Sequence, residues 1–279
     1  MSEYKMSTMR GVRTFLKVGS CSETAFNVID RGFGNPHVHE ENASMPFAGG
    51  ILQHGYQCGL LWGSALAAGT EAYRRFGPTP KAEAGAVFAA QRVIEAFRGR
   101  YGEINCLELI ETDWRNKAQV VRYMLKGGSF RCFGMAGKFT QTAHRIIDEA
   151  LSEETFPVTD APVSCAAELA RKMGATEEQV VMAAGLTGGI GLSGGACGAL
   201  GAAMWLMALK HGEGENKVDY KDPRGHTLVE AFLESSDFEF ECEKIVGRRF
   251  SDTAEHAAFV REGGCAALIG RITEAAAVL

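Results

Sequence analysis

The sequence predicts an all-α protein made of two homologous helical repeats related by a pseudo-twofold axis. Two observations lead to this prediction: apolar residues recur at helical spacing with little strict alternation, and several sequence anchors occur twice. The length agrees, because 279 residues correspond to about two domains of roughly 150 residues each. The eight cysteines also divide evenly between the two halves.

The two halves of the chain carry their cysteines in parallel series. The series are Cys21, Cys58, Cys106 and Cys132 in the first half and Cys165, Cys197, Cys242 and Cys265 in the second. A Gly-Gly-Ile triplet ends seven residues before Cys58 and Cys197, and a Gly-Gly pair begins 21 residues after Cys106 and Cys242. We therefore expect a tandem duplication with domains at 1–152 and 160–279, joined through the proline-containing stretch 151–162.

Helical periodicity places several elements along each half. The expected helices are 81–98, 115–126 and 140–151 in the first half and 176–184, 227–233 and 253–261 in the second. The segment FEFEC at 238–242 is the exception, since it alternates like a short strand. The uncharged stretch 180–209 contains eight glycines, so we expect a buried loop followed by a helix of about a dozen residues, and no membrane span.

Most cysteines are expected at the first turn of a helix. Ser20 and Asn105 each stand just before a cysteine and three residues before a glutamate, which is the capping-box arrangement. Ser164 precedes Cys165 in the same way, and the other cysteines follow glycine-rich or loop-like segments. The pattern predicts at least seven of the eight cysteines at helix starts, with Cys242 fitting it least well.

Cysteines at helix starts favour redox or metal chemistry. A helix N-terminus offers unpaired N–H groups and a partial positive charge, which stabilise a thiolate and any anionic group bound to it. Iron-sulfur clusters need four cysteine sulfurs in the common case, and each half supplies four. We therefore expect all eight cysteines to ligate iron-sulfur clusters, either [4Fe-4S] or [2Fe-2S]. Thiol/disulfide chemistry, another metal and inert buried cysteines remain alternatives.

Several other classes of protein are excluded or disfavoured. The chain contains no CxxC, which excludes the ferredoxin runs, zinc ribbons, thioredoxin motifs and c-type haem attachment. A net charge of −5 shows no excess of basic residues of the kind that binds nucleic acid or an anionic membrane. The first residues lack the apolar core of a signal peptide, so we expect a cytoplasmic protein whose thiols stay reduced.

Other polar and aromatic residues have two interpretations each. His54 could hydrogen-bond or ligate a cluster, but a neutral histidine satisfied by the backbone is favoured. A solvated loop is favoured over a metal site for His37 and His39. Trp62 and Trp205 are expected to pack in the core.

Each half resembles the redox-active C_GCAxxG_C_C family, which is named for four cysteines and a Cys-Gly-Ala-x-x-Gly element. The resemblance lies in GGILQHGYQCGLLWGSALAAG around Cys58, GEINCLELI around Cys106 and GGIGLSGGACGALGA around Cys197, and it extends from about Cys21 to Leu279. Leu60 replaces the motif alanine in the first half, and Ala202 replaces the last motif glycine in the second.

The resemblance implies redox chemistry, the two cysteine series as the family's site residues, and a redox partner protein, in an anaerobic cell. A similar domain also occurs in a cytochrome that carries an iron-sulfur cluster. The predicted function is thus an iron-sulfur electron-transfer protein, with reduction of a small substrate as an option. The alternatives are a dithiol/disulfide oxidoreductase and a metal-binding accessory module of an oxidoreductase or transporter. Enzymatic activity and homo-oligomerisation are left open.

Overall fold

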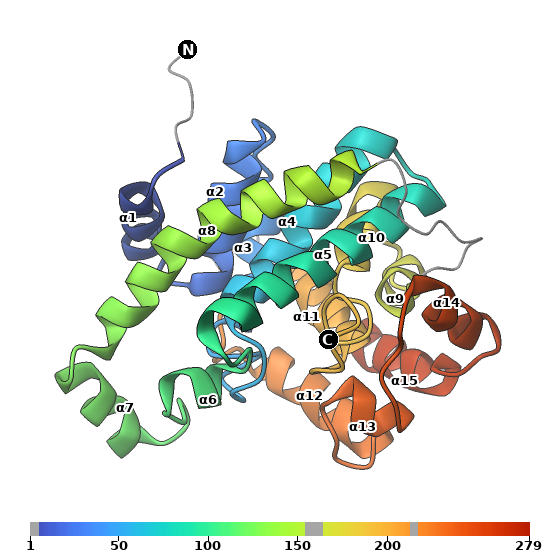
Figure 1. Cartoon of the computed structure of the whole chain (residues 1–279). Helices are drawn as coiled ribbons and strands as arrows, with labels where there is room; N and C mark the ends of the chain where they lie inside the picture. Colours follow the sequence, from blue (N-terminus) through green and yellow to red (C-terminus); the bar gives the residue numbers. More distant parts are fainter. Residues whose placement is uncertain (1–5, 154–163, 213–216) are drawn as a thin grey trace.

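The computed structural model describes residues 6–153, 164–212 and 217–279, and the regular secondary structure of this part of the chain is helical (Figure 1). Extended pairing within it is limited to two isolated bridges, Gln57 with Asn105 and Ala196 with Glu241. The all-α prediction is therefore confirmed. The strand expected at 238–242 is wrong, since only the bridge at Glu241 forms there. Most of the predicted linker, from residue 154 onward, lies outside the described residues.

The first repeat begins with two helices and ends with the longest one. Its elements are α1 (Thr8–Val18), α2 (Cys21–Gly32), α3 (Val38–Ala43), the 3-10 turn η1 (Met45–Phe47), α4 (Gly59–Phe76), α5 (Pro80–Tyr101), α6 (Cys106–Ile110), α7 (Lys117–Leu125) and α8 (Gly128–Ser152). The helix expected at 140–151 is thus the second half of α8, which begins at the Gly127-Gly128 pair.

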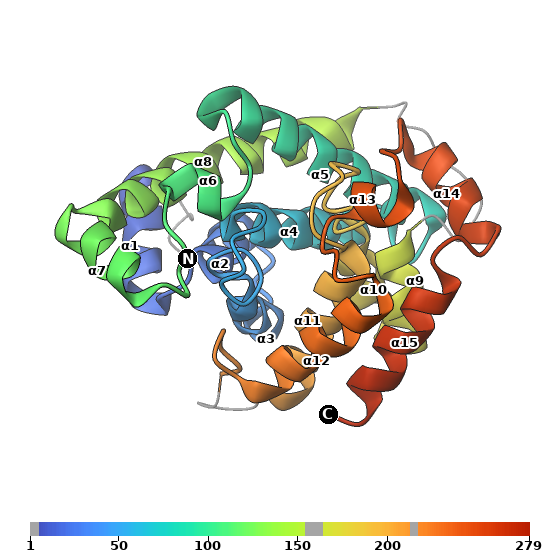
Figure 2. The same cartoon turned by 90° about the horizontal axis from the view of Figure 1, so that it is seen from below.

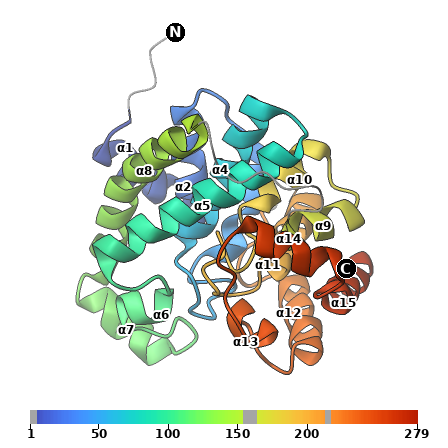
Figure 3. The same cartoon turned by 45° about the vertical axis from the view of Figure 1, so that its right-hand side comes forward.

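The second repeat follows the same order from its first cysteine onward. Its elements are α9 (Cys165–Lys172), α10 (Glu177–Ala184), α11 (Gly198–His211), α12 (Pro223–Ser235), α13 (Cys242–Val246), α14 (Thr253–Arg261) and α15 (Ala266–Ala277). The repeated anchors pair α2 with α9, α4 with α11, α6 with α13, α7 with α14 and α8 with α15. Figure 3 shows α6, α7 and α8 on one side of the molecule and α13, α14 and α15 on the other.

Helix α4 lies at the centre and joins the two repeats. It packs against α2 and α5 of its own repeat and against α10 of the other. Glycines allow these close approaches: a Cβ at Gly63 would lie 2.1 Å from the Ser22 oxygen, and one at Gly69 would lie 2.4 Å from the Met182 Cα. The two halves consequently share one continuous hydrophobic core.

Two tryptophans fill the shared core, as predicted. Trp62 is completely buried, stacks on Phe47 at a ring distance of 4.7 Å and lies against Gly201 of the second repeat. Trp205 is also buried, and its indole N–H donates to the Glu40 carbonyl oxygen of the first repeat at 3.0 Å. Both side chains therefore stabilise the contact between the repeats.

The uncharged stretch 180–209 contains the predicted loop and helix. Helix α10 ends at Ala184, residues 185–197 form a buried loop, and α11 starts at Gly198. Among the residues with described structure, no helix has the length and apolarity needed to cross a membrane.

Candidate redox site

A left-handed backbone turn precedes the second cysteine of each quartet. Residues 49–53 and residues 188–192 all have positive φ angles. A Cβ at Gly50 would lie 2.3 Å from the Tyr56 oxygen, and one at Gly189 would lie 2.4 Å from the Gly195 oxygen. Glycine is needed at both positions, because a side chain would collide with the chain as it returns toward the cysteine.

Two backbone hydrogen bonds connect the segments that carry the second and third cysteines of each quartet. The Cys58 N–H donates to the Ile104 oxygen at 2.7 Å, and the Cys106 N–H donates to the Tyr56 oxygen at 2.7 Å. The second repeat has the equivalent bonds, from Cys197 to Phe240 at 2.8 Å and from Cys242 to Gly195 at 2.7 Å. These bonds place two cysteines 48 or 45 residues apart in the sequence on adjacent segments.

Seven of the eight cysteines begin or cap a helix, as the sequence predicts. Cys21, Cys106, Cys165 and Cys242 are first residues of helices, whereas Cys58, Cys197 and Cys265 are N-caps. The exception is Cys132, the fifth residue of α8, and not Cys242. The first turn of α8 is instead formed by residues that follow Gly127, whose positive φ starts the helix early.

The predicted capping boxes form only in part. Ser20 accepts a hydrogen bond from the Glu23 N–H at 3.4 Å, but the Glu23 carboxylate pairs with Lys217 at 2.6 Å. Asn105 makes no capping hydrogen bond with its side chain, whose Oδ1 is buried without a partner in the described structure. Ser164 caps α9 as expected, by accepting from the Ala167 N–H.

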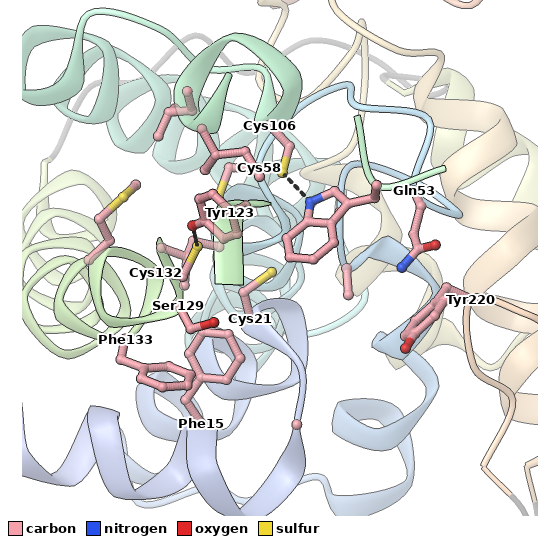
Figure 4. Close-up of a pocket in the computed structure, with 18 of the residues that line it drawn as sticks. Phe15, Cys21, Gln53, Cys58, Cys106, Tyr123, Ser129, Cys132, Phe133 and Tyr220 are labelled. Atoms are coloured by element: carbon pink, nitrogen blue, oxygen red, sulfur yellow. Dashed lines mark hydrogen bonds between the residues drawn. The ribbon is translucent and has the colours of Figure 1, made fainter. Parts of the chain in front are cut away.

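The first quartet lines a single cavity of about 340 Å³. Figure 4 shows Cys21, Cys58, Cys106 and Cys132 directed toward this space from α2, α4, α6 and α8. Most of the remaining lining is apolar or aromatic and includes Phe15, Leu60, Trp114, Tyr123, Phe133 and Met135. The structure thus brings all four predicted residues of the first repeat to one place.

Two aromatic side chains make polar contacts with the sulfurs of this quartet. The Trp114 indole N–H donates to Cys106 Sγ at 3.4 Å. The Tyr123 hydroxyl lies 3.2 Å from Cys132 Sγ and donates to the Gly128 oxygen at 2.6 Å. Neither residue is predicted from the sequence, although each lies between Cys106 and Cys132 in a segment predicted to be helical or adjacent to a helix.

The second quartet has the same arrangement but is closed. Cys165, Cys197, Cys242 and Cys265 enclose a void of about 10 Å³, which is at the lower limit for one water molecule. Phe250 and Phe259 occupy the positions equivalent to Trp114 and Tyr123: the Phe259 ring packs on Gly264 as the Tyr123 ring packs on Gly128. The second site therefore lacks the indole N–H and the phenol hydroxyl of the first.

Burial keeps most of the cysteine thiols protonated when no metal or cluster is bound to them. It raises the pKa values of Cys106 and Cys197 to about 12, and it raises those of Cys132, Cys165, Cys242 and Cys265 as well. Cys21 is different: the Cys58 thiol donates to it, as do the Gly49 and Ser22 N–H groups, and its pKa is lowered. The same hydrogen bond raises the pKa of Cys58 well above its usual range.

Backbone N–H groups point at equivalent sulfurs in both repeats. The Gly49 N–H donates to Cys21 and the Gly188 N–H donates to Cys165, each from the start of a left-handed turn. The Leu60 N–H donates to Cys58, and the Ala199 and Leu200 N–H groups donate to Cys197. Such donors favour thiolates and sulfur-bound anionic groups.

No group of three or more His, Cys, Asp or Glu side chains is arranged to hold a metal ion within residues 6–153, 164–212 and 217–279.

The histidines singled out in the sequence have different surroundings. His54 contacts Arg115 and Phe240 at 3.2 and 4.9 Å, and burial lowers its pKa to about 4, so it is a neutral histidine. The expectation of a solvated His37 is wrong, because its ring bonds to Asp30 and Glu178, whereas His39 is exposed.

Comparison with known proteins assigns the chain to a family. A family model described as "Putative redox-active protein (C_GCAxxG_C_C)" matches residues 20–146 and again residues 163–279. Neither the curated proteins nor the solved structures contain a match to this chain. The two matches each span one complete cysteine quartet, which confirms the tandem duplication. The chain therefore belongs to the redox-active C_GCAxxG_C_C family and contains its four-cysteine domain twice.

Proposed function

We propose that this protein is an iron-sulfur electron-transfer protein whose first repeat binds a cluster through Cys21, Cys58, Cys106 and Cys132. The observation that carries this proposal is that four thiols from four helices line one cavity of about 340 Å³. Four cysteine sulfurs are the common ligand set of [2Fe-2S] and [4Fe-4S] clusters. Such a cluster, when bound, exchanges single electrons.

The surroundings of the first quartet fit this group. The lining is mostly apolar, and the N–H groups of Gly49, Leu60 and Trp114 donate to three of the four sulfurs. Burial alone opposes thiolates, as the raised pKa of Cys106 shows. Binding of a positively charged metal would displace these protons, because thiolates and not thiols are the ligands.

The second quartet offers four cysteine sulfurs without the same space. Its four sulfurs enclose about 10 Å³, so they must separate before Cys165, Cys197, Cys242 and Cys265 can ligate a cluster. We keep these four residues as proposed ligands of a second cluster. Whether one or both sites fill is decided by the iron content per chain.

The test is to purify the protein without oxygen and to measure iron, acid-labile sulfide and visible absorption before and after dithionite. Cys58→Ser and Cys197→Ser form the matched pair, since both residues are N-caps of equivalent helices. We expect Cys58→Ser to lose the iron of the first site and to leave any iron of the second. A colourless wild-type protein with eight reactive thiols would refute the proposal.

A dithiol/disulfide oxidoreductase is the second candidate, favoured by the hydrogen bond between Cys58 and Cys21. The pKa of Cys21 is lowered and that of Cys58 is raised, so Cys21 ionises more readily than its partner thiol, as the attacking cysteine of a reactive pair does. This function predicts that mild oxidation of the iron-free protein joins Cys21 to Cys58 and releases two electrons to the oxidant. Peptide mapping of the oxidised protein would identify that bond.

A further inference from the structure

Two segments beside the first cavity carry only positive charge. Residues 6–19 and 114–139 contain nine basic residues and no acidic residue, whereas the rest of the chain contains 20 basic and 34 acidic residues. All nine side chains are exposed: Arg10, Arg13, Lys17, Arg115, Lys117, Arg122, Lys126, Arg131 and Lys138. A protein with a net charge of −5 thus has one strongly basic region.

The same two segments carry most of the exposed large apolar side chains. Six of the ten such residues in the described chain lie here: Met9, Leu16, Val121, Met124, Leu125 and Phe130. Leu125 and Phe130 are 84% and 77% exposed. Large apolar side chains left in water among charges of one sign are typical of a surface that is covered by a partner.

The helices that carry these residues form one surface around the opening of the cavity. Helix α1 packs along α8, where a Cβ at Gly11 would lie 2.7 Å from the Gly137 Cα, and α7 packs against α8 as well. Figure 2 shows α1, α7 and this end of α8 together at one end of the molecule. Leu16 from α1 and Met124 from α7 both line the cavity. We call this surface the basic apolar face.

Most of the positive charges on this face are available to a partner. Arg115 is paired with Asp113 at 3.3 Å. Seven others form no ion pair with any residue of the described structure: Arg13, Lys17, Lys117, Arg122, Lys126, Arg131 and Lys138. Their charges are therefore not neutralised within the part of the chain that the structure describes.

We propose that the basic apolar face docks an acidic protein that carries single electrons, and that the electron passes from it to the first-repeat site. This proposal rests on the proposed function. Opposite charge steers such a carrier to the face and orients it, while the central apolar side chains supply contact area. Leu16 and Met124 of this face line the same cavity as the half-buried Cys132, so a docked carrier comes close to one of the four sulfurs. The carrier loses one electron and the first-repeat site gains it.

Charge alone would also attract a nucleic acid or an anionic membrane. A nucleic acid duplex would leave Leu125 and Phe130 in water, because it presents its charged backbone to this face and keeps the faces of its bases stacked inside. A membrane would cover the cavity opening with lipid and prevent approach of an electron donor. A protein carrier is the partner that uses the charges, the apolar side chains and the redox cavity together.

The experiment compares charge reversal on the face with the same reversal elsewhere. The face variant is Arg13→Glu/Arg122→Glu, and the control is Arg92→Glu/Arg271→Glu, whose side chains are exposed on α5 and α15. An acidic [2Fe-2S] ferredoxin is the probe. Binding of the oxidised probe and the rate at which the reduced probe reduces the anaerobic protein are both measured at several salt concentrations.

At low salt, we expect the face variant to bind the oxidised ferredoxin about 10-fold more weakly than the wild type does. We also expect the reduced ferredoxin to reduce the face variant about 10-fold more slowly. The control substitutions should change the affinity and the rate by less than about 2-fold. Added salt should lower both quantities in the wild type toward the values of the face variant. Equal losses in both variants would overturn the proposal. So would binding to phosphatidylglycerol vesicles or duplex DNA without binding to the ferredoxin.

The binding measurement separates this proposal from the proposed function. A protein without iron that still binds ferredoxin through Arg13 and Arg122 would refute the cluster and retain the docking face. A protein that contains iron and is reduced by dithionite, but shows no dependence on these charges, would retain the cluster and refute the docking face.

Discussion

The Gln57 side chain of the first repeat is hydrogen-bonded to the Ala196 backbone of the second. Its Oε1 accepts from the Ala196 N–H at 3.0 Å, and its Nε2 donates to the Gly189 oxygen at 2.8 Å. Gln57 precedes Cys58 and Ala196 precedes Cys197, so the partners occupy equivalent positions. A Cβ at Gly195 would lie 1.8 Å from Gln57 Nε2, so only glycine leaves room. The two cysteine loops are therefore fixed to each other.

Replacing Gln57 with leucine should destabilise the protein. The substitution leaves the buried Ala196 N–H without its partner, whereas the Gly189 oxygen still accepts a hydrogen bond from the Ser193 hydroxyl. At about 1–3 kcal/mol for one unsatisfied buried group, we expect a loss of about 1–3 kcal/mol in the free energy of unfolding, measured with urea. The control is Gln91→Leu, whose half-buried side chain makes no hydrogen bond within the described structure. Equal effects of both substitutions would contradict this role of Gln57.

Gly63 sets the distance between α2 and α4, and an alanine there should disturb the first quartet. The added Cβ would lie 2.1 Å from the Ser22 oxygen and 3.0 Å from the Phe26 nitrogen. We expect Gly63→Ala to cost about 1–3 kcal/mol of stability through overpacking. The shift separates Cys21 from Cys58, so the iron content of the proposed cluster site should fall too.

Gly99→Ala is the matched control for this prediction. Gly99 is exposed near the end of α5, and nothing lies within 4 Å of an added Cβ. It should stabilise the protein by about 0.5–1 kcal/mol, because alanine favours the helix over glycine. A Gly63→Ala protein as stable as wild type, with full iron, would show that α2 and α4 can separate without cost.

The sequence predicted the duplication and the positions of the cysteines because both depend on spacing along the chain. Capping residues and glycines placed Cys21, Cys165 and Cys197 at helix starts, and the structure agrees. Cys132 was misplaced because the start of α8 depends on the left-handed Gly127, and no capping side chain marks that residue.

The difference between the two quartets could not be predicted from spacing. Trp114 and Tyr123 bring polar groups to the sulfurs in the first repeat, and Phe250 and Phe259 do not in the second. The volumes enclosed, about 340 and about 10 Å³, depend on how α6, α7 and α8 pack, compared with α13, α14 and α15. Helix positions in sequence do not determine that packing. The shared core and the bond from Gln57 to Ala196 are likewise contacts between repeats.

Stability should fall as the pH rises through the titration of His37. The His37 ring is hydrogen-bonded to Asp30 of α2 at 3.0 Å and to Glu178 of α10 at 3.1 Å, and the His37 backbone N–H donates to the Glu41 carboxylate. The bond to Asp30 raises the pKa of His37 from 6.5 to about 9. The stabilisation is therefore complete below the unfolded pKa of 6.5 and is lost as the pH rises through 9.

The titration of Asp30 also lowers the stability as the pH rises. Burial raises the pKa of Asp30 from 3.8 to about 7, so the folded protein also binds that proton more tightly than the unfolded chain. We expect the melting temperature to decrease between pH 6 and pH 9, by about 2–4 °C for each kcal/mol of stability lost, measured by circular dichroism. His37→Gln should flatten this dependence, whereas His39→Gln, at an exposed histidine of the same helix, should preserve it. A wild-type protein that becomes more stable over this range would contradict the assignment.

The Trp114 indole should tune the potential of the first site, given the proposed cluster. Its N–H donates to Cys106 Sγ at 3.4 Å, and a hydrogen bond to a cysteine sulfur stabilises the reduced, more negative state. Trp114→Phe should therefore make the reduction potential more negative, with the iron content unchanged, as measured by anaerobic redox titration of the visible spectrum. Trp205→Phe is the control, because that indole donates to the Glu40 oxygen in the shared core. A potential that shifts equally in both variants would indicate a general loss of packing, whereas a shift confined to Trp114→Phe assigns the effect to this one hydrogen bond.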